Sequence, residues 1–115
     1  MLDMTNEHLN IQLAKLMGNV KMDVTTVFYG QIPQYCTDPS ASLEVQAAAC
    51  EVDASLWSRN MLVVRGMSTK MACEIRHLAL PVVAQLCNAS PRERAEAAYM
   101  TLSSWVQHTK EEKQS

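Results

Sequence analysis

Apolar residues near the start of the chain recur every three or four positions, the spacing that places them on one face of a helix. They are Leu9, Leu13, Leu16, Met17 and Val20. Thr5 precedes this pattern with a side chain that can cap the helix, and Glu7 suits the positive end of the helix dipole. Gly18 stands where a left-handed C-terminal residue is favoured. The pattern therefore predicts a helix over residues 6–17.

A second apolar run follows Thr37, Asp38 and Pro39. A threonine or aspartate oxygen can accept from the first free N–H groups of a helix, and proline fits the first helical turn. The segment that follows, SASLEVQAAACEVDA, consists of good helix formers. These features predict a second, largely buried helix over residues 39–53.

The middle of the chain has a different periodicity. Residues 61–64, Met-Leu-Val-Val, are typical of a buried strand, and residues 66–69 have the composition of a turn. Apolar and polar residues alternate over 70–77, so the sequence predicts a β-hairpin here. Residues 80–84 fit either a third strand at the sheet edge or a short helical turn. Residues 24–30 fit either a short strand or a loop that packs its aromatic side chains.

The last segment begins with the clearest cap of the chain. Residues 90–93, Ser-Pro-Arg-Glu, match a capping box with proline at the first helical position. The apolar stripe that follows predicts a helix over residues 91–107, and the polar tail 108–115 is expected to fray. The stripe consists of Ala95, Ala98, Tyr99, Leu102, Trp105 and Val106.

Together these elements predict one α/β domain over residues 1–115: a small α/β/α-type sandwich, with three helices around a short antiparallel sheet of two or three strands. A chain of 115 residues with 48% hydrophobic residues suits a single domain with its own core. The formal charge of −2 gives no overall basic field that would indicate nucleic acid or anionic membrane as a partner. The N-terminus lacks the features of a secretory signal, and no apolar run reaches the ~20 residues of a membrane span. We therefore expect a cytoplasmic protein.

The residues with reactive side chains form no recognisable motif. The four cysteines are too widely spaced for a zinc site, so we expect free thiols, no metal and no cofactor. Cys36 precedes a predicted helix N-terminus, whose dipole can lower the pKa of a thiol; the alternative is that Cys36 only packs against the helix start. Cys73 and His77 would lie about 13 Å apart on the predicted strand, too far for a nucleophile–base pair. On a helix they would be neighbours, but the alternation favours the strand. A glycine-rich phosphate loop is absent from the sequence.

Charge is distributed unevenly along the chain. Residues 1–58 carry two basic and seven acidic residues, whereas residues 59–94 carry six basic and two acidic residues. The predicted hairpin would place several of these cations at the rims of one sheet, where they could bind an anionic ligand or an acidic partner. The alternative is that they only keep a sheet edge soluble. The candidate binding residues are Arg59, Arg65, Lys70, Arg76 and Arg92.

Three stretches resemble the phage ABA sandwich domain family, small bacteriophage and prophage proteins. They are IPQYCTDPSASLEV, QLCNASPRERAEAAYMTL and HLNIQLAKLMG. In the first, the positions that match the family are Tyr35, Cys36, Thr37, Asp38 and Ala41. The resemblance implies an α/β/α or two-layer α/β architecture and a phage origin. It implies no catalytic residues, because the family has none established.

These observations lead to three functional hypotheses. The first is a non-enzymatic phage-derived protein in the bacterial host cytoplasm that docks on a host or phage protein, plausibly as an inhibitor of a bacterial defence system. The second is an oligomer that binds a small anion such as a nucleotide. The third is a thiol-dependent enzyme that uses Cys36. Because a short sheet leaves unpaired edges, we also expect a homo-oligomer, with a dimer favoured.

Overall fold

The computed structural model describes residues 2–21, 32–74 and 80–114, and all regular structure in these ranges is helical. The predicted α/β sandwich is therefore wrong: in the described ranges the protein is an all-α globule without a strand. No helix in the same ranges is long and apolar enough to cross a membrane. The helices are α1 (Asn6–Lys21), α3 (Pro39–Val64), α4 (Thr69–Glu74), α5 (Leu80–Cys87) and α6 (Pro91–Gln114).

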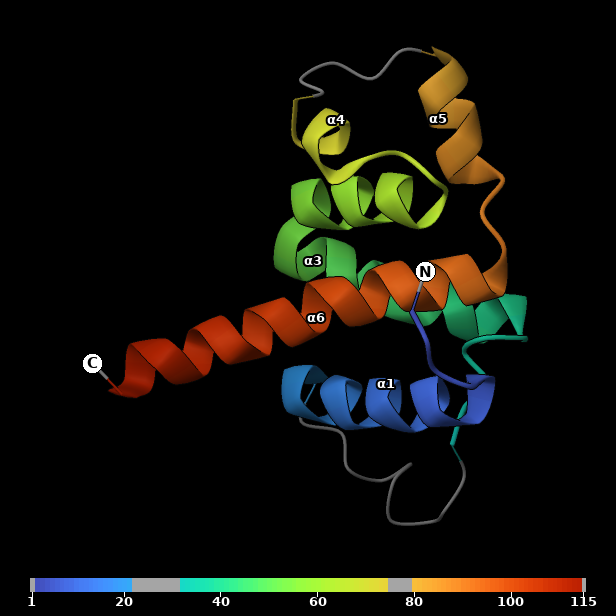
Figure 1. Ribbon diagram of the computed structural model, residues 1–115. Helices are drawn as coiled ribbons and strands as arrows, with labels where there is room; N and C mark the ends of the chain where they lie inside the picture. Colours follow the sequence, from blue (N-terminus) through green and yellow to red (C-terminus); the bar gives the residue numbers. More distant parts are fainter. Residues whose placement is uncertain (1, 22–31, 75–79, 115) are drawn as a thin grey trace.

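The long C-terminal helix α6 is the centre of the arrangement (Figure 1). It runs between α1 on one side and α3 on the other, and its most extensive contacts are with α3. Among the described helices, α4 and α5 contact only α3. Both lie at the end of the molecule farthest from α1 (Figure 1).

One hydrophobic core lies where α1, α3 and α6 meet. Its larger fully buried side chains are Leu9 and Leu13 of α1, Val45 and Met61 of α3, and Leu102 of α6. Buried alanines of the same helices make up much of the rest of the core. The predicted apolar stripes of α1 and α6 are confirmed at these positions.

The helix starts agree with the predicted caps. The Thr5 hydroxyl accepts from the N–H of His8 at 3.1 Å, and the Asp38 carboxylate accepts from the N–H of Ser40 at 3.2 Å. The capping box at α6 is reciprocal, since Ser90 and Glu93 each accept from the other's backbone N–H. The predicted stop at Gly18 is wrong, because α1 continues to Lys21. Helix α6 likewise continues beyond residue 107, through the tail that was expected to fray, as far as Gln114.

The predicted hairpin is replaced by helices. Residues 61–64 are the last turn of α3, and most of the alternating segment is the short helix α4. The chain leaves α3 in a Schellman motif, in which Met67 donates to Leu62 and Gly66 to Val63. Gly66 has φ +108, a conformation that favours glycine, so the predicted turn here is confirmed. Residues 80–84 take the helical alternative as part of α5, whereas the interpretations of 24–30 and of residues 75–77 lie outside the described residues.

Helix α3 is two helical halves joined at Asp53. Asp53 has φ −162 and ψ 91, which is extended rather than helical. Its carboxylate accepts from the N–H of Leu56 at 3.0 Å, the bond that an N-cap makes at the start of a helix. Asp53 therefore ends the first half of α3 and caps the second.

Candidate functional site

The five predicted binding cations are not held on a common sheet, because the hairpin that was to align them does not form. Arg59 on α3 and Lys70 on α4 are exposed. Arg65 and Arg92 are in ion pairs with carboxylates of α6, and Arg76 lies outside the described residues. The geometric basis for an anion site on a basic sheet face is therefore lost.

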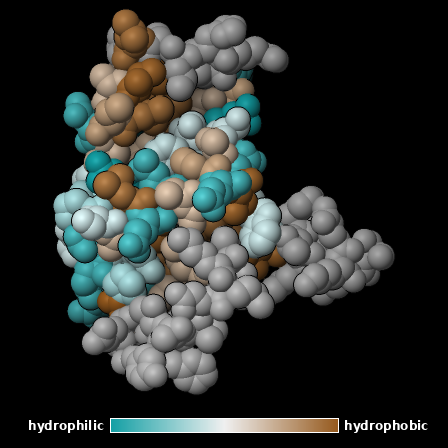
Figure 2. Space-filling model, turned by 180° about the vertical axis from the view of Figure 1, so that it is seen from behind, coloured by the Kyte–Doolittle hydropathy of each residue, from teal (hydrophilic) through white to brown (hydrophobic). Residues whose placement is uncertain are grey.

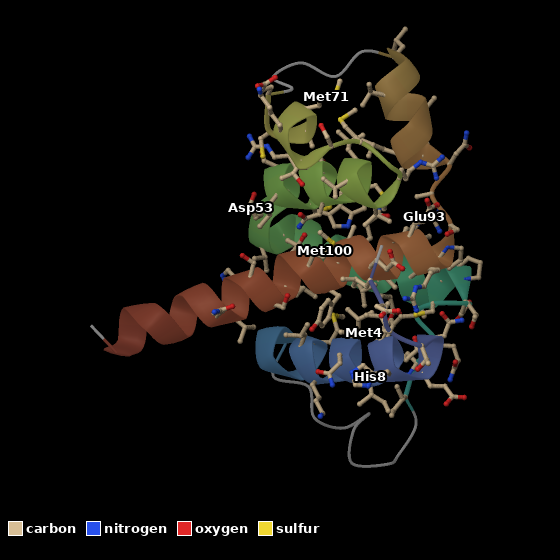
Figure 3. The ribbon with its side chains drawn as sticks, viewed as in Figure 1. Met4, His8, Asp53, Met71, Glu93 and Met100 are labelled. Atoms are coloured by element: carbon tan, nitrogen blue, oxygen red, sulfur yellow. The ribbon has the colours of Figure 1, made fainter. Side chains whose placement is uncertain are left out.

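Arg65 has a structural role at the junction of α3 and α6. Its Nη1 atom lies 2.8 Å from the Oε1 atom of Glu93, which also accepts from the N–H of Ser90 at 2.9 Å. The carboxylate of the capping box thus also fixes the end of α3 to the start of α6. Figure 3 shows Glu93 at this end of α6.

Arg92 forms the most connected polar group in the described ranges. Its Nε atom donates to Glu96 Oε1 at 2.7 Å, and its Nη1 atom donates to Asn6 Oδ1 at 2.8 Å. Its Nη2 atom donates to the carbonyl oxygens of Met4 at 2.8 Å and Leu2 at 3.3 Å. One side chain on α6 therefore holds both the segment before α1 and the first residue of α1. Met4 lies between α1 and α6 (Figure 3).

Glu96 is an ionisable residue in the interior. Its side chain is 2% exposed, and in the described part of the chain its Oε2 atom has no hydrogen-bond partner. A buried carboxylate is tolerated only where a cation or hydrogen-bond donors compensate for the lost water. Here the Arg92 guanidinium provides that compensation through the other oxygen, Oε1.

The Cys36 thiol is buried in the same group. It donates to the carbonyl oxygen of Asn6 at 3.6 Å and accepts from Arg92 Nη1 at 3.9 Å. Burial raises the pKa of the Cys36 thiol above its ordinary value, although the Arg92 guanidinium opposes the shift. Of the two interpretations of Cys36, packing against the start of the helix fits this environment, whereas the thiolate needed by a nucleophile is disfavoured. We call Leu2, Met4, Asn6, Cys36, Arg92 and Glu96 the Arg92 cluster.

The neighbouring Tyr35 gives a pH-dependent prediction. Burial, and secondly the negative charge of Glu44, raise the pKa of Tyr35 to about 12. The phenol proton of Tyr35 is lost near pH 10 in the unfolded chain and at higher pH in the folded chain. The contribution of the buried neutral phenol to stability is therefore fully present below pH 10 and is lost between pH 10 and 12. We expect the free energy of unfolding, measured by urea titration, to fall by up to about 2 kcal/mol across this range. Tyr35→Phe should weaken that fall; an unchanged pH profile would contradict the assignment.

Exposed apolar side chains lie on both α4 and α5, at the end of the molecule farthest from α1. Leu80 is 84% exposed, and Met71 and Val83 are also exposed. Figure 2 shows apolar side chains gathered at this end, and Figure 3 shows Met71 on α4. Isolated exposed apolar residues are ordinary, whereas a group of them on a weakly packed helix marks an interaction site. We call Met71, Leu80 and Val83 the α4–α5 surface.

A groove of about 390 Å³ lies between α1 and the middle of α6. Its lining mixes apolar and polar groups and carries one charged residue, Lys15. Ser103, on its wall, already donates to the carbonyl of Tyr99 at 2.6 Å. The groove therefore offers no convergent set of polar groups that would identify a ligand. The lining residues are Gln12, Lys15, Leu16, Tyr99, Ser103, Val106 and Gln107.

Sequence reasoning missed both features that distinguish this structure. The signal for the α4–α5 surface was the apolar run at residues 80–84, which a strand interpretation would have paired within a sheet. Among the partners of Arg92, Glu96 lies only four residues later on the same helix, whereas Leu2 and Met4 lie about ninety positions earlier and had no local signal. Within the described ranges, no group of three or more His, Cys, Asp and Glu residues could hold a metal ion.

The α4–α5 surface and the Arg92 cluster are thus the two candidate sites among the described residues. One is an exposed apolar face, and the other is a buried polar group. No protein-family model matches this chain, and comparisons with curated proteins and with solved structures likewise gave no match.

Proposed function

We propose that this chain is a non-enzymatic protein that docks on a macromolecular partner, and that a partner protein binds the α4–α5 surface. The observation that carries the proposal is the exposure of α5. A helix of sequence LPVVAQLC that contacts only α3 among the described helices leaves Leu80 84% exposed and Val83 37% exposed. Burying such side chains against another protein contributes about 1.5–3 kcal/mol each.

The chemistry of the surface favours a protein over a charged ligand. The core of a protein–protein interface is depleted in charged residues and enriched in methionine, and polar residues form its rim. Met71, Leu80 and Val83 supply the apolar centre, while Lys70 and Glu74 are exposed on the same short helix as Met71. The partner would therefore present an apolar patch with mixed charge around it.

The more specific functional hypotheses have less support from the structure. A role as inhibitor of a bacterial defence system, in a bacterial host cytoplasm, follows from the resemblance to phage proteins alone. The anion-binding hypothesis required a basic sheet face, and the predicted sheet does not form. Two of its cations, Arg65 and Arg92, are in ion pairs. An enzyme that uses Cys36 would need a thiolate, which the burial of this side chain disfavours.

The test is a quantitative capture experiment from bacterial lysate with three immobilised proteins. They are the wild type, the double variant Leu80→Glu/Val83→Glu, and the matched control Leu43→Glu, which places a charge at a residue that is 48% exposed on α3. We expect a stoichiometric protein partner with the wild type and the control, and at least a tenfold loss with the double variant. Purified partner then gives the affinity by calorimetry.

Two outcomes would contradict the proposal. One is a partner that all three proteins retain equally, which would place the interface elsewhere. The other is a concentration-dependent dimer in sedimentation that only Leu80→Glu/Val83→Glu dissociates, which would assign the surface to a second copy of the chain. The predicted dimer remains a prediction that the same sedimentation experiment decides.

A further inference from the structure

Residues 2–5 form an extended segment that leads into α1, and we call it the N-terminal strap. The chain passes over α6 before it enters α1 (Figure 1). The strap is fixed mainly through its backbone, since the carbonyl oxygens of Leu2 and Met4 accept from Arg92 Nη2. The side chains of Leu2 and Met4 are half-buried against the core, whereas Asp3 and Thr5 are exposed.

Arg92 joins the strap to the buried groups of the Arg92 cluster. The same guanidinium that holds the strap carbonyls contacts Cys36 Sγ through Nη1 and Glu96 Oε1 through Nε. The Cys36 residue is 4% exposed, and its thiol donates to the carbonyl of Asn6, the first residue of α1, directly after the strap. Asn6 and Arg92 therefore lie directly against this thiol, and the strap carbonyls hold Arg92 in that place.

Glu96 is a second unusual group of the same cluster. Its side chain is 98% buried, and its Oε2 atom has no hydrogen-bond partner in the ranges that the structure describes. A buried oxygen of a carboxylate without a partner is rare and points to a group that the site can accept. The cluster thus combines a thiol, an unpartnered carboxylate oxygen and a guanidinium under one short segment.

The strap is attached much more weakly than the helices beneath it. Residues 2–4 are held by two hydrogen bonds to one side chain and by two half-buried apolar residues, and Thr5 accepts only from His8 and Leu9 of α1, whereas α1, α3 and α6 share the whole core. Segments with few buried contacts open locally at a free energy well below that of global unfolding. Opening of the strap would leave the core between the helices in place.

We propose that the N-terminal strap is a releasable cover, and that its opening makes Cys36 a site of thiol modification while the helices remain packed. The reactive group supplied from outside is an electrophile small enough to enter beside Arg92. With iodoacetamide as the probe, the sulfur of Cys36 displaces iodide and forms a thioether, and the thiol proton passes to solvent. This inference concerns a different part of the molecule from the α4–α5 surface and does not rest on the proposed function.

The test measures alkylation of each cysteine in the full chain by peptide mass spectrometry, at urea concentrations below the unfolding transition. Cys73 and Cys87 are exposed and report direct reaction, whereas half-buried Cys50 on α3 lies away from the strap in sequence and serves as reference. We expect the alkylation rate of Cys36 to be nearly independent of urea concentration below the unfolding transition. Met4→Asp should raise that rate about tenfold with Cys50 unchanged, and the matched control Asp3→Ala should leave it within about twofold.

Two results would overturn the proposal. In the wild type, a Cys36 rate that follows the urea dependence of global unfolding down to zero urea would show that no local opening exists. In the variant, an equal increase at Cys36 and Cys50 would show that Met4→Asp acts on the whole fold. If Met4→Asp does not fold, the urea dependence measured on the wild type decides the question alone.

Discussion

Replacing Arg92 with alanine is expected to lower the free energy of unfolding by about 3 kcal/mol. The substitution removes the cation that compensates for Glu96, whose side chain is 2% exposed, and leaves a buried carboxylate without its ion pair. It also removes the donors that hold Leu2 and Met4. For a chain of this length the loss corresponds to a fall in melting temperature of about 10 °C, measurable by circular dichroism.

Two further variants test whether the uncompensated Glu96 carboxylate is the main cause of the loss of stability in Arg92→Ala. Arg94→Ala removes a neighbouring arginine of α6 whose Nη1 atom donates to the Ser42 hydroxyl at 3.3 Å, and we expect a loss of about 1 kcal/mol or less. The double variant Arg92→Met/Glu96→Met leaves no charge in the interior and should be more stable than Arg92→Ala. A double variant that is less stable than Arg92→Ala would show that the uncompensated charge is not the main cost.

Replacing Leu102 with alanine is expected to have a similar effect, a loss of about 3 kcal/mol. Leu102 is fully buried on α6, the helix that packs between α1 and α3. The truncated side chain leaves a cavity that both neighbouring helices would have to move to fill. Chemical denaturation should show a lower midpoint with an unchanged slope, since the surface exposed on unfolding stays almost the same.

The matched control for this cavity is Leu43→Ala. Leu43 has the same side chain on another long helix but is 48% exposed, so its truncation should change stability by no more than about 0.5 kcal/mol. Equal losses at Leu43 and Leu102 would contradict the placement of the core between α1, α3 and α6.

Local sequence signals predicted the ends of the long helices well. Thr5, Asp38 and the Ser90–Glu93 box all make the predicted bonds, because a cap depends on residues within one turn of each other. Gly18 was misleading because the end of a helix depends on more than the residues within one turn. A glycine within a helix costs about 1 kcal/mol, which packing of a long amphipathic helix easily outweighs.

The hairpin was predicted wrongly because the buried positions of α3 do not follow one helical period. Val45 and Met61 are both fully buried in the same core. In an unbroken helix, sixteen residues would place them about 160° apart around the axis. The break at Asp53 turns the second half so that both face the core. It coincides with the predicted end of the second helix at residue 53, but the helix that resumes after it was not predicted. Residues 61–64 therefore looked like an independent apolar run.

The candidate site depended on the same error. Once residues 61–64 and 70–77 were interpreted as paired strands, the cations around them, including Arg65 and Arg76, were placed at the rims of one sheet. The helical fold instead brings Arg65 to Glu93 and Arg92 to the strap, contacts between residues far apart in sequence. The apolar composition of the α4–α5 surface is visible in the sequence. Its exposure is not, because it depends on the small contact between α5 and α3.

The break at Asp53 also defines the nearest competing structure of this segment. Residues 39–64 contain many alanines and other good helix formers, so a straight helix would satisfy the backbone equally well and would be the favoured form of an isolated peptide. That form would turn Trp57 and Met61 away from the side on which Val45 is buried. The native bend is thus selected by burial against α6 together with the Asp53 cap. The straight and the bent form differ mainly at residue 53, so a measurement of helix content alone would not distinguish them.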